Sequence, residues 1–422
     1  MDSILVQDVI SDLPQSIVET ILTKIPIRDA VRTSILSSKW RYKWANLTHL
    51  VFDDRCSSLY NDKGLVEGNL VKFITRFLFL HDGPIHMFTL SSTYLQGSSY
   101  IDQWLLFLSR KDVKELVIEL GDREWFRAPT CLFSCRKLTR LELIRCELDP
   151  PPSFKGFLSL KCLVLQQVLI APDKVENLLS SCPLLESLTL SYFDSFALSI
   201  CAPNLKYLCL EGEFKDIRLE NTPLLIFVSV SMYTDDTAEH FEQSSTCNFD
   251  KFLGGVPCLQ RLIGYIYFTK YLSVGNELGK LQITYSHLKI VQLYEVSFED
   301  MKEILVVLRL ILNSPILQEL QISSSSNTSL ATEATDLDFW ENECPSDCTF
   351  RLLKSVKIAD ISGVPHEMEF IKFLLRNSPV LEVMSIIPST CVTDGRINML
   401  IELLRFRRAS AEAEITFTQP RM

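Results

Sequence analysis

Positive charge is scarce in this sequence. It contains 42 lysines and arginines but 52 acidic residues, which gives a formal net charge of -10 at pH 7. A protein that binds DNA or RNA normally carries a basic domain or a basic stripe on one face. We therefore expect no nucleic-acid partner for the chain.

The sequence also lacks the signals of a membrane or secreted protein. Residues 1 to 5 contain no basic region, and no long apolar run follows them. The most apolar helical stretch, Ile304 to Leu312, is short and is interrupted by Arg309. The thirteen cysteines are odd in number and lie mostly in apolar runs, as core cysteines do in a reducing compartment. We expect a protein of the cytoplasm, the nucleus or both, without a membrane partner.

No group of residues has the spacing of a catalytic or metal-binding set. The six histidines form no such pattern, and His366-Glu367 lacks the second histidine of a metalloprotease helix. Two cysteine pairs have a spacing that a metal could use, but no second pair lies near either of them. These pairs are Cys131/Cys135 and Cys344/Cys348. We expect a protein that is not an enzyme, with no catalytic residue, no metal and no cofactor.

The N-terminal segment predicts three short helices. Pro14 lies where the first turn of a helix tolerates proline, and Pro26 ends that helix. A second helix is predicted over Ile27 to Ser34, and a third carries Trp40 and Trp44 four residues apart on one face. Apolar residues recur at helical spacing along the first helix, namely Ile17, Ile21, Leu22 and Ile25. So short a segment cannot bury all this surface alone, which implies a partner helix bundle.

The order of these elements resembles an F-box. The residues that carry the resemblance, between about Asp8 and Trp44, are Leu13-Pro14, Ala30 to Ser34, Leu36-Ser37, Trp40 and Trp44. F-boxes dock on a Skp-type adaptor, which joins them to a cullin-based ubiquitin ligase, so the resemblance implies these partners. It places adaptor contacts on Leu13, Pro14, Ile17, Ile21, Ile25, Val31, Leu36 and Trp40, although some of these must support the module's own core.

One phrase, Leu-x-x-Leu-x-Leu or a close aliphatic variant, recurs through the rest of the chain. Clear copies begin at Leu138, Leu160, Leu185, Leu205, Leu225, Leu288, Leu317, Leu353 and Leu381, and weaker copies at Leu47, Ile85, Val113 and Leu259. Most are roughly 20 to 29 residues apart, the range of leucine-rich repeats. The fourth and sixth positions point inward along a short strand. The phrase predicts an α/β fold, a curved solenoid with a parallel sheet on its concave face.

Helical stretches separate these strands, and two segments interrupt the period. The helices are predicted over Leu70 to Leu80, Ile101 to Leu108, Val175 to Leu179, Phe298 to Leu312 and Met368 to Leu375. Residues 233 to 247 are polar and acidic. Residues 323 to 349 open with a serine run and carry six acids without a Lys or Arg. Such composition predicts a flexible excursion from the array.

The C-terminal region resembles the FBD domain of plant proteins. The matching residues are Cys348, Leu352, Lys354, Val356, Ile358, Gly363, Glu367-Met368-Glu369, Ile371, Phe373-Leu374-Leu375, Asn377, Leu381-Glu382 and Met384. A final helix is predicted over Ile397 to Phe406 and a strand over Glu414 to Thr418, which together cap the array. The expected domains are an F-box over 1–46, a solenoid over 47–343 and the FBD region over 344–422.

These resemblances imply the substrate-recognition subunit of a Skp-cullin-F-box ubiquitin ligase, which holds an unknown target protein near the charged enzyme. The outward positions of the strands are expected to contact that target. These positions are Arg140, Glu142, Tyr207, Glu211, Phe227, Arg261, Tyr265 and Tyr294. Two other functions stay open, a hormone-like small-molecule receptor with a polar pocket, and a non-ligase interaction scaffold whose first helices merely cap the solenoid.

Overall fold

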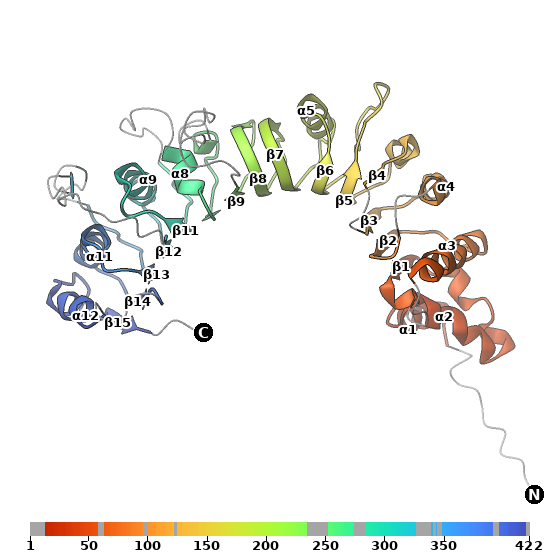
Figure 1. The fold of residues 1–422 in the computed structure, drawn as a ribbon, viewed down its shortest axis with the longest axis horizontal. Helices are drawn as coiled ribbons and strands as arrows, with labels where there is room; N and C mark the ends of the chain where they lie inside the picture. The colour runs from red at the N-terminus through yellow and green to blue at the C-terminus, as the bar shows by residue number, and fades with distance from the viewer. Residues whose placement is uncertain are drawn as a thin grey trace, which may run out of the picture. The chain divides into compact units, whose positions relative to one another are not determined.

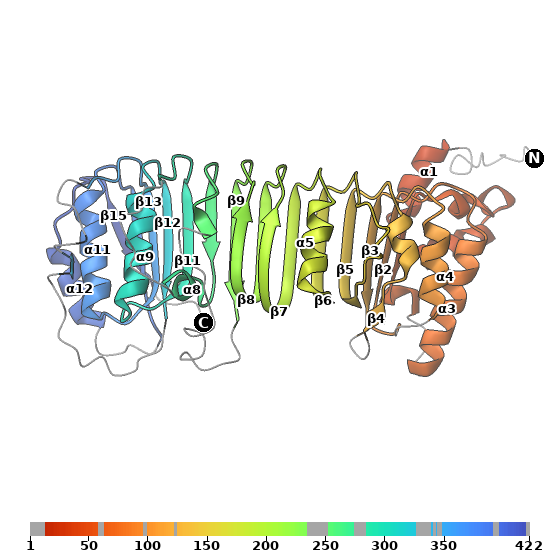
Figure 2. The same ribbon diagram turned by 90° about the horizontal axis from the view of Figure 1, so that it is seen from above.

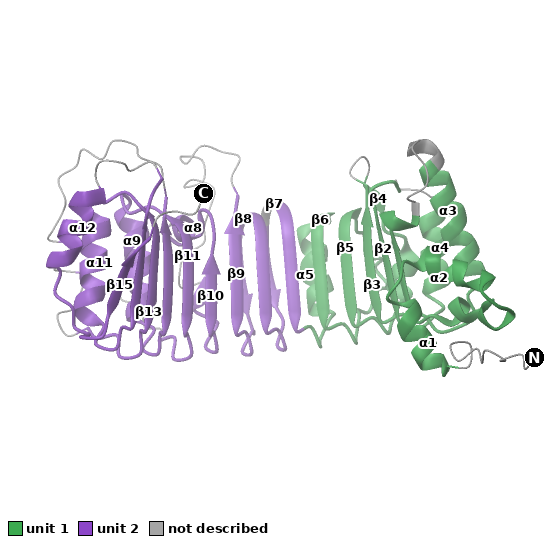
Figure 3. Ribbon diagram, turned by 90° about the horizontal axis from the view of Figure 1, so that it is seen from below, with its two compact units in different colours: residues 1–185 green, residues 186–422 purple. Residues whose placement is uncertain are grey.

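The structure is a computed structural model in which two compact units can be described, residues 1–185 and residues 186–422 (Figure 3). The described residues are 13–57, 63–95, 99–121, 125–233, 252–273, 284–325, 339–340, 343, 348–390 and 396–418. In each unit, parallel strands form a sheet, and helices cover one of its faces (Figures 1 and 2). Among the described residues, no helix lies on the opposite face of either sheet (Figures 1 and 2).

The first unit begins with the small helical module. Its elements are α1 (Gln15–Leu22), α2 (Ile27–Arg32) and the 3-10 turns η1 (Thr33–Ile35), η2 (Ser38–Trp40) and η3 (Lys43–Asn46). The third predicted helix is therefore replaced by two 3-10 turns, because Tyr42 leaves the helical region with φ -127° and ψ 14°. Trp40 and Trp44 consequently lie on separate turns, and both are buried.

Five parallel strands follow in sequence order in the first unit. They are β1 (His49–Asp53), β2 (Met87–Ser92), β3 (Glu115–Leu120), β5 (Arg140–Glu147) and β6 (Cys162–Leu169), and the short β4 (Phe126–Arg127) pairs with β5. The connections contain η4 (Asp54–Ser57), α3 (Lys63–Phe79), α4 (Ser99–Leu108), η5 (Thr130–Ser134) and α5 (Pro172–Ser180). The predicted alternation of strand and helix holds after β1, β2 and β6, whereas the described residues between β3 and β5 and between β5 and β6 contain no α-helix.

The second unit continues the pattern with longer strands at its start. Its strands are β7 (Ser187–Cys201), β8 (Tyr207–Glu220), β9 (Phe227–Met232), β10 (Arg261–Gly264), β11 (Ile290–Val296), β12 (Glu319–Ser324), β13 (Ser355–Ile361), β14 (Val383–Pro388) and β15 (Glu414–Phe417). Its described helices are α8 (Phe268–Ser273), α9 (Met301–Leu312), α11 (Pro365–Asn377) and α12 (Arg396–Arg405). The predicted final helix and final strand are both present.

The strand register follows the repeated phrase residue by residue. In the second unit, the fourth positions align as Leu188, Leu208, Val228, Leu262, Val291, Leu320, Val356 and Met384. All of them are buried. In the first unit, Leu50, Phe88, Leu116, Leu141 and Leu163 align in the same way. The weak N-terminal copies of the phrase are therefore true repeats, and the predicted parallel α/β repeat fold is confirmed.

The copy that begins at Leu259 is weak because a glycine replaces its last aliphatic residue. Gly264 occupies the sixth position and pairs with Val230 and Leu293. A Cβ atom on Gly264 would lie 2.1 Å from Cδ1 of Phe268, whose ring comes from α8. The aromatic side chain thus fills the volume that an aliphatic residue fills in the other repeats.

Replacing Gly264 with valine should lower the stability of the chain by about 1 to 3 kcal/mol, because the new side chain overpacks the core against Phe268. Gly68 is the matched control, since it lies in α3 with nothing within 4 Å of an added Cβ. Gly68→Ala should raise stability slightly through helix propensity. Thermal unfolding of both full-length variants tests this, and an unchanged midpoint for Gly264→Val would contradict it.

Two helices of the second unit carry a buried glutamate in their first turn. Glu303 in α9 accepts hydrogen bonds from the Thr269 hydroxyl at 2.5 Å and the Ser297 N–H at 3.2 Å. Glu367 in α11 accepts the Ser324 hydroxyl at 2.6 Å and three N–H groups of residues 362 to 364. Burial raises the pKa of Glu303 to about 7 and also raises the pKa of Glu367. Each glutamate ties its helix to a neighbouring segment of the array.

The raised pKa of Glu303 makes stability depend on pH. In the folded chain the pKa of this carboxyl is about 7, whereas in the unfolded chain it has the ordinary value of 4.5. The folded chain therefore binds this proton more tightly. The free energy of unfolding should therefore fall as pH rises from 4.5 to 7, by up to about 3 kcal/mol. Glu303→Gln, which keeps an acceptor, should stabilise the chain at pH 8 and change little at pH 4.5. Melting curves that shift equally at both pH values would refute this.

The two expected insertions have different outcomes. Residues 234 to 247 of the first lie outside the described part of the chain. The second was expected to be a flexible excursion from its first serine, but Ser323 and Ser324 belong to β12 and are buried. The Ser323 hydroxyl donates to Asp360 at 2.6 Å, and that of Ser324 donates to Glu367. These partners come from the next repeat, which explains why two polar residues end a strand. Residues 326 to 338 lie outside the described part.

Candidate functional site

Two surfaces are candidates for binding other proteins, and the first is apolar and lies on the N-terminal module. Helix α1 buries Val18 and Leu22 but leaves Ile17 and Ile21 exposed. The module exposes further aliphatic side chains in and just after the turn η1, because Ile35 is 84% exposed and Leu36 is 70% exposed. Several exposed aliphatic side chains on so small a module make it a candidate for protein binding.

The eight predicted adaptor contacts divide by exposure. Five are exposed, namely Pro14, Ile17, Ile21, Ile25 and Leu36, and two are half-buried, Leu13 and Val31. Trp40 differs, because it is only 5% exposed and therefore belongs to the core of the module. Sequence reasoning missed Ile35 and Tyr42, whose exposure depends on the 3-10 turns that replace the third helix.

Specific contacts attach this module to the start of the first sheet. Glu19 of α1 accepts a hydrogen bond from the backbone N–H of Thr48 at 3.0 Å, and also from its hydroxyl. The Trp44 ring packs 4.8 Å from that of Phe77 in α3, and its indole N–H donates to Ser34 at 3.0 Å. These contacts attach the module to the residues around β1 and α3, at the start of the repeat.

The second surface is the helix-free face of the second unit, where aromatic side chains gather. Tyr207 of β8 and Phe227 of β9 are register partners whose ring centroids lie 6.3 Å apart. Phe227 in turn pairs with Arg261 of β10. Alternation along each strand sends these residues outward while their neighbours fill the core. Three of the predicted target contacts thus form one continuous row.

A second row on the same face contains a stacked tyrosine pair. The rings of Tyr265 and Tyr294 lie 4.9 Å apart and are nearly parallel, at 7°. Burial, and secondly the nearby Tyr265, raise the pKa of Tyr294, so its phenol stays neutral at physiological pH. Arg261 donates a hydrogen bond to Gln292 at 3.3 Å beside this pair. The row offers flat apolar rings together with hydroxyl and guanidinium donors.

Sequence reasoning missed a second stacked pair, Tyr192 and Tyr233. Their ring centroids lie 6.1 Å apart at 15°. The Tyr233 hydroxyl donates to the predicted contact Glu211, and burial together with this carboxylate raises the pKa of Tyr233 to about 12. Glu211 is therefore engaged within the chain, and it positions an aromatic ring.

A recurring backbone feature explains why Tyr192 was missed. The residue two places after the sixth position of the phrase adopts a positive φ in six repeats: Arg145, Gln167, Tyr192, Gly212, Glu295 and Asp360. This left-handed conformation interrupts the strand register, as it does after Leu293 and after Ile358. Non-glycine residues adopt it at a cost. A strict alternation of inward and outward residues therefore fails at this position, although its fixed offset from the phrase could reveal it.

The remaining predicted target contacts lie in the first unit. The Arg140 guanidinium forms an ion pair with Glu142 at 2.7 Å and donates to the sulfur of Cys162 at 3.3 Å. Both charged groups thus have partners within the chain, on the same strand or the next. Their register neighbours on β3 and β6 are Glu115, Val117, Cys162 and Val164, none of which is aromatic.

Metal and membrane features were also sought in the described part of the chain. It contains no group of three or more His, Cys, Asp or Glu residues placed to hold a metal ion. Burial raises the pKa of Cys135 to about 12 and raises that of Cys131, so both thiols stay protonated at neutral pH. Cys344 lies outside the described residues. Among the described helices, none is long and apolar enough to cross a bilayer.

Three protein-family models match parts of the chain. An F-box domain model matches residues 10–51, and an FBD model matches residues 341–386. A model described as the leucine-rich repeats of FBD-associated F-box protein At5g56370 matches residues 101–322. The repeat fold and the N-terminal module therefore define a leucine-rich-repeat protein with an F-box. Proteins of this class are generally adaptors that recognise substrates, and not catalysts.

Relatives in Arabidopsis thaliana define the family more closely. F-box/FBD/LRR-repeat protein At1g13570 is 57% identical over 412 residues, which cover 98% of this chain and 99% of that protein. FBD-associated F-box protein At5g56370 is 27% identical and covers 97% of this chain. Among solved structures, an internalin from Listeria monocytogenes aligns with 84% of this chain at 15% identity and a TM-score of 0.36. By its plant relatives, the chain belongs to the F-box/FBD/LRR-repeat family.

Proposed function

We propose that the chain is the substrate-recognition subunit of a Skp-cullin-F-box ubiquitin ligase. The observation that carries this proposal is the exposed apolar surface on the F-box, formed by α1 and η1. In an isolated module these exposed apolar side chains contribute no stability. Docking on an adaptor would remove them from water, and each Å² of buried apolar surface contributes about 25 cal/mol of favourable free energy. The chain works in the cytoplasm or the nucleus, where the ligase acts.

The chain contributes to ubiquitin transfer through proximity. The F-box binds a Skp-type adaptor and, through it, the cullin subunits, while the repeat sheet holds the target protein. Holding both on one chain raises the effective concentration of target lysines near the charged enzyme. The chain itself needs no acid, base or nucleophile for this role.

The target binds on the helix-free face of the second unit. Its anchors are the rows formed by Tyr207, Phe227 and Arg261 and by Tyr265 and Tyr294. Aromatic residues and arginine are the usual hot spots of protein interfaces. The predicted contacts Arg140 and Glu142 have a lesser role, because each already satisfies the other.

Mixing the purified chain with a purified Skp-type adaptor tests the proposal. The two should elute as a one-to-one complex in size-exclusion chromatography with light scattering at micromolar concentration. Adding the cullin, its RING subunit and the ubiquitin enzymes should then give target ubiquitination that depends on the chain. Separate elution of chain and adaptor would overturn the ligase role and would favour the alternative function, a non-ligase interaction scaffold.

A further inference from the structure

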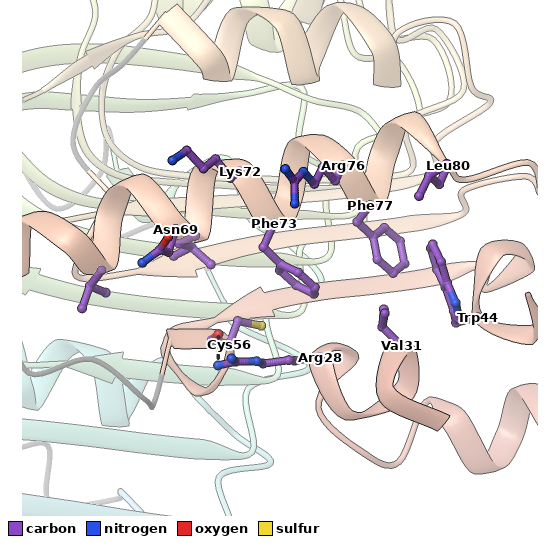
Figure 4. A pocket seen from close by; sticks show the side chains of 12 residues that line it. Arg28, Val31, Trp44, Cys56, Asn69, Lys72, Phe73, Arg76, Phe77 and Leu80 are labelled. Atoms are coloured by element: carbon purple, nitrogen blue, oxygen red, sulfur yellow. Dashed lines mark hydrogen bonds between the residues drawn. The ribbon is translucent and has the colours of Figure 1, made fainter. Parts of the chain in front are cut away.

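A groove of about 380 Å³ lies in the first unit, between the F-box helix α2 and the repeat helix α3 (Figure 4). Its volume is within the range of sites for small organic ligands. One wall is a stripe along α3 that includes Leu70, Phe73 and Phe77, spaced as one face of a helix. Val31 and Trp44 form part of the opposite wall.

The groove is apolar along most of its length. The stripe runs from Val66 to Leu80, which corresponds to about 20 Å of helix at 1.5 Å per residue. The ring centroids of Trp44 and Phe77 lie 4.8 Å apart, so the two walls are in contact there. Phe73 remains half-buried, and Leu80 is exposed. A long and narrow apolar surface of this kind fits an extended chain of methylene groups better than a compact ring.

The charged residues of the groove are all cations. Arg28 comes from α2, while Lys72 and Arg76 flank the apolar stripe on α3, and no Asp or Glu is among the lining residues. This is unexpected in a chain whose formal net charge is -10. The Arg28 guanidinium is fixed by a hydrogen bond of 3.2 Å to the carbonyl oxygen of Cys56.

Lys72 and Arg76 have no counter-ion among the described residues. They lie four residues apart on one helix, where like charges destabilise each other by a few tenths of a kcal/mol. An anion held by these two side chains would relieve this repulsion. Guanidinium groups bind carboxylate in a bidentate manner, which makes a carboxylate a suitable head group.

We propose that this groove binds a medium-chain carboxylate, with the acyl chain along α3 and the head group at Lys72 and Arg76. Each methylene group that enters the groove contributes about 0.8 kcal/mol of hydrophobic free energy. The site lies outside the exposed residues of α1 and η1 and outside the helix-free face of the second unit, and it does not rest on the proposed ligase function. Val31 belongs to this groove and also to the predicted adaptor contacts, so a bound acyl chain bridges the F-box and the first repeat.

Titration of the full-length chain with dodecanoate, followed by calorimetry, tests the proposal. One site per chain is expected, with a dissociation constant in the micromolar range. Lys72→Glu with Arg76→Glu should weaken binding about tenfold or more, and Phe73→Asp should abolish it. Lys302→Glu, which changes an exposed residue of α9, is the matched control and should leave the affinity unchanged. Melting temperatures establish that each variant is folded.

The comparison ligands decide which part of the proposal holds. Methyl dodecanoate, which lacks the charge, should bind about tenfold more weakly than dodecanoate. Equal binding of the two would overturn the role of the cations. Binding of many molecules per chain, or equal loss with Lys302→Glu, would overturn the site by showing nonspecific adsorption. Association with phosphatidylserine vesicles but not with monomeric dodecanoate would also overturn it, by showing a membrane contact.

Discussion

Replacing Ile21 and Leu36 together with glutamate should lower the affinity of the chain for a Skp-type adaptor by at least about a hundredfold. Both side chains are exposed in the free chain and lie on the proposed adaptor surface, on α1 and beside η1. Truncation of a central interface anchor typically costs about 2 kcal/mol, and burying an unpaired charge costs more. Calorimetric titration of adaptor into the full-length variant measures the effect.

The matched control is Ser16→Glu, an exposed position on the same helix that points away from Ile21. It adds one negative charge to α1 without touching the apolar stripe, so adaptor binding should be retained. The melting temperature of the double variant should also match that of the wild type, because neither side chain supports the core. Full adaptor affinity in a correctly folded double variant would be incompatible with the proposed surface.

A second large effect is expected when the stacked pair on the repeat sheet is removed. Tyr265→Ala with Tyr294→Ala should weaken target binding by about thirtyfold or more, because the pair supplies two flat anchors beside Arg261. The target is first isolated by affinity purification from cells whose proteasome is blocked. Its affinity for the wild type and the variant is then compared in solution.

The control for this experiment is Lys302→Glu, which lies on α9 among the helices that cover the other face. Its affinity for the target should equal that of the wild type. Adaptor binding should be unaffected in both variants, because the F-box is in the other unit. Should the α9 variant lose the target while the tyrosine variant keeps it, the target surface would have to be assigned to the helices.

The sequence predicted the repeat well because the phrase and the strand register have the same physical origin. An aliphatic residue at the fourth position must face the core in every copy, so Leu188, Leu208 and Val228 align without further information. The same reasoning located the exposed stripe on the F-box, since Ile17 and Ile21 are one helical turn apart. Periodicity was therefore sufficient to predict the repeat fold and to point to most residues of one candidate surface.

The features that escaped prediction depend on contacts between segments. Trp40 was assigned to the adaptor, yet the 3-10 turns rotate it into the core of the module. Tyr192 itself occupies the left-handed position, which alternation does not foresee. Gly264 is compensated by Phe268 from the following helix, and Ser323 is held by Asp360 of the next repeat. None of these relations can be read from the spacing within a single copy.

The most direct test is a bridging experiment with immobilised target, soluble adaptor and the full-length chain. The account predicts that adaptor is retained on the target only when the wild-type chain is present. The Ile21→Glu, Leu36→Glu variant should stay on the target without adaptor, and the Tyr265→Ala, Tyr294→Ala variant should bind adaptor but leave the target. Retention of adaptor in the absence of the chain, or loss of both partners by either variant, would contradict the two-surface account.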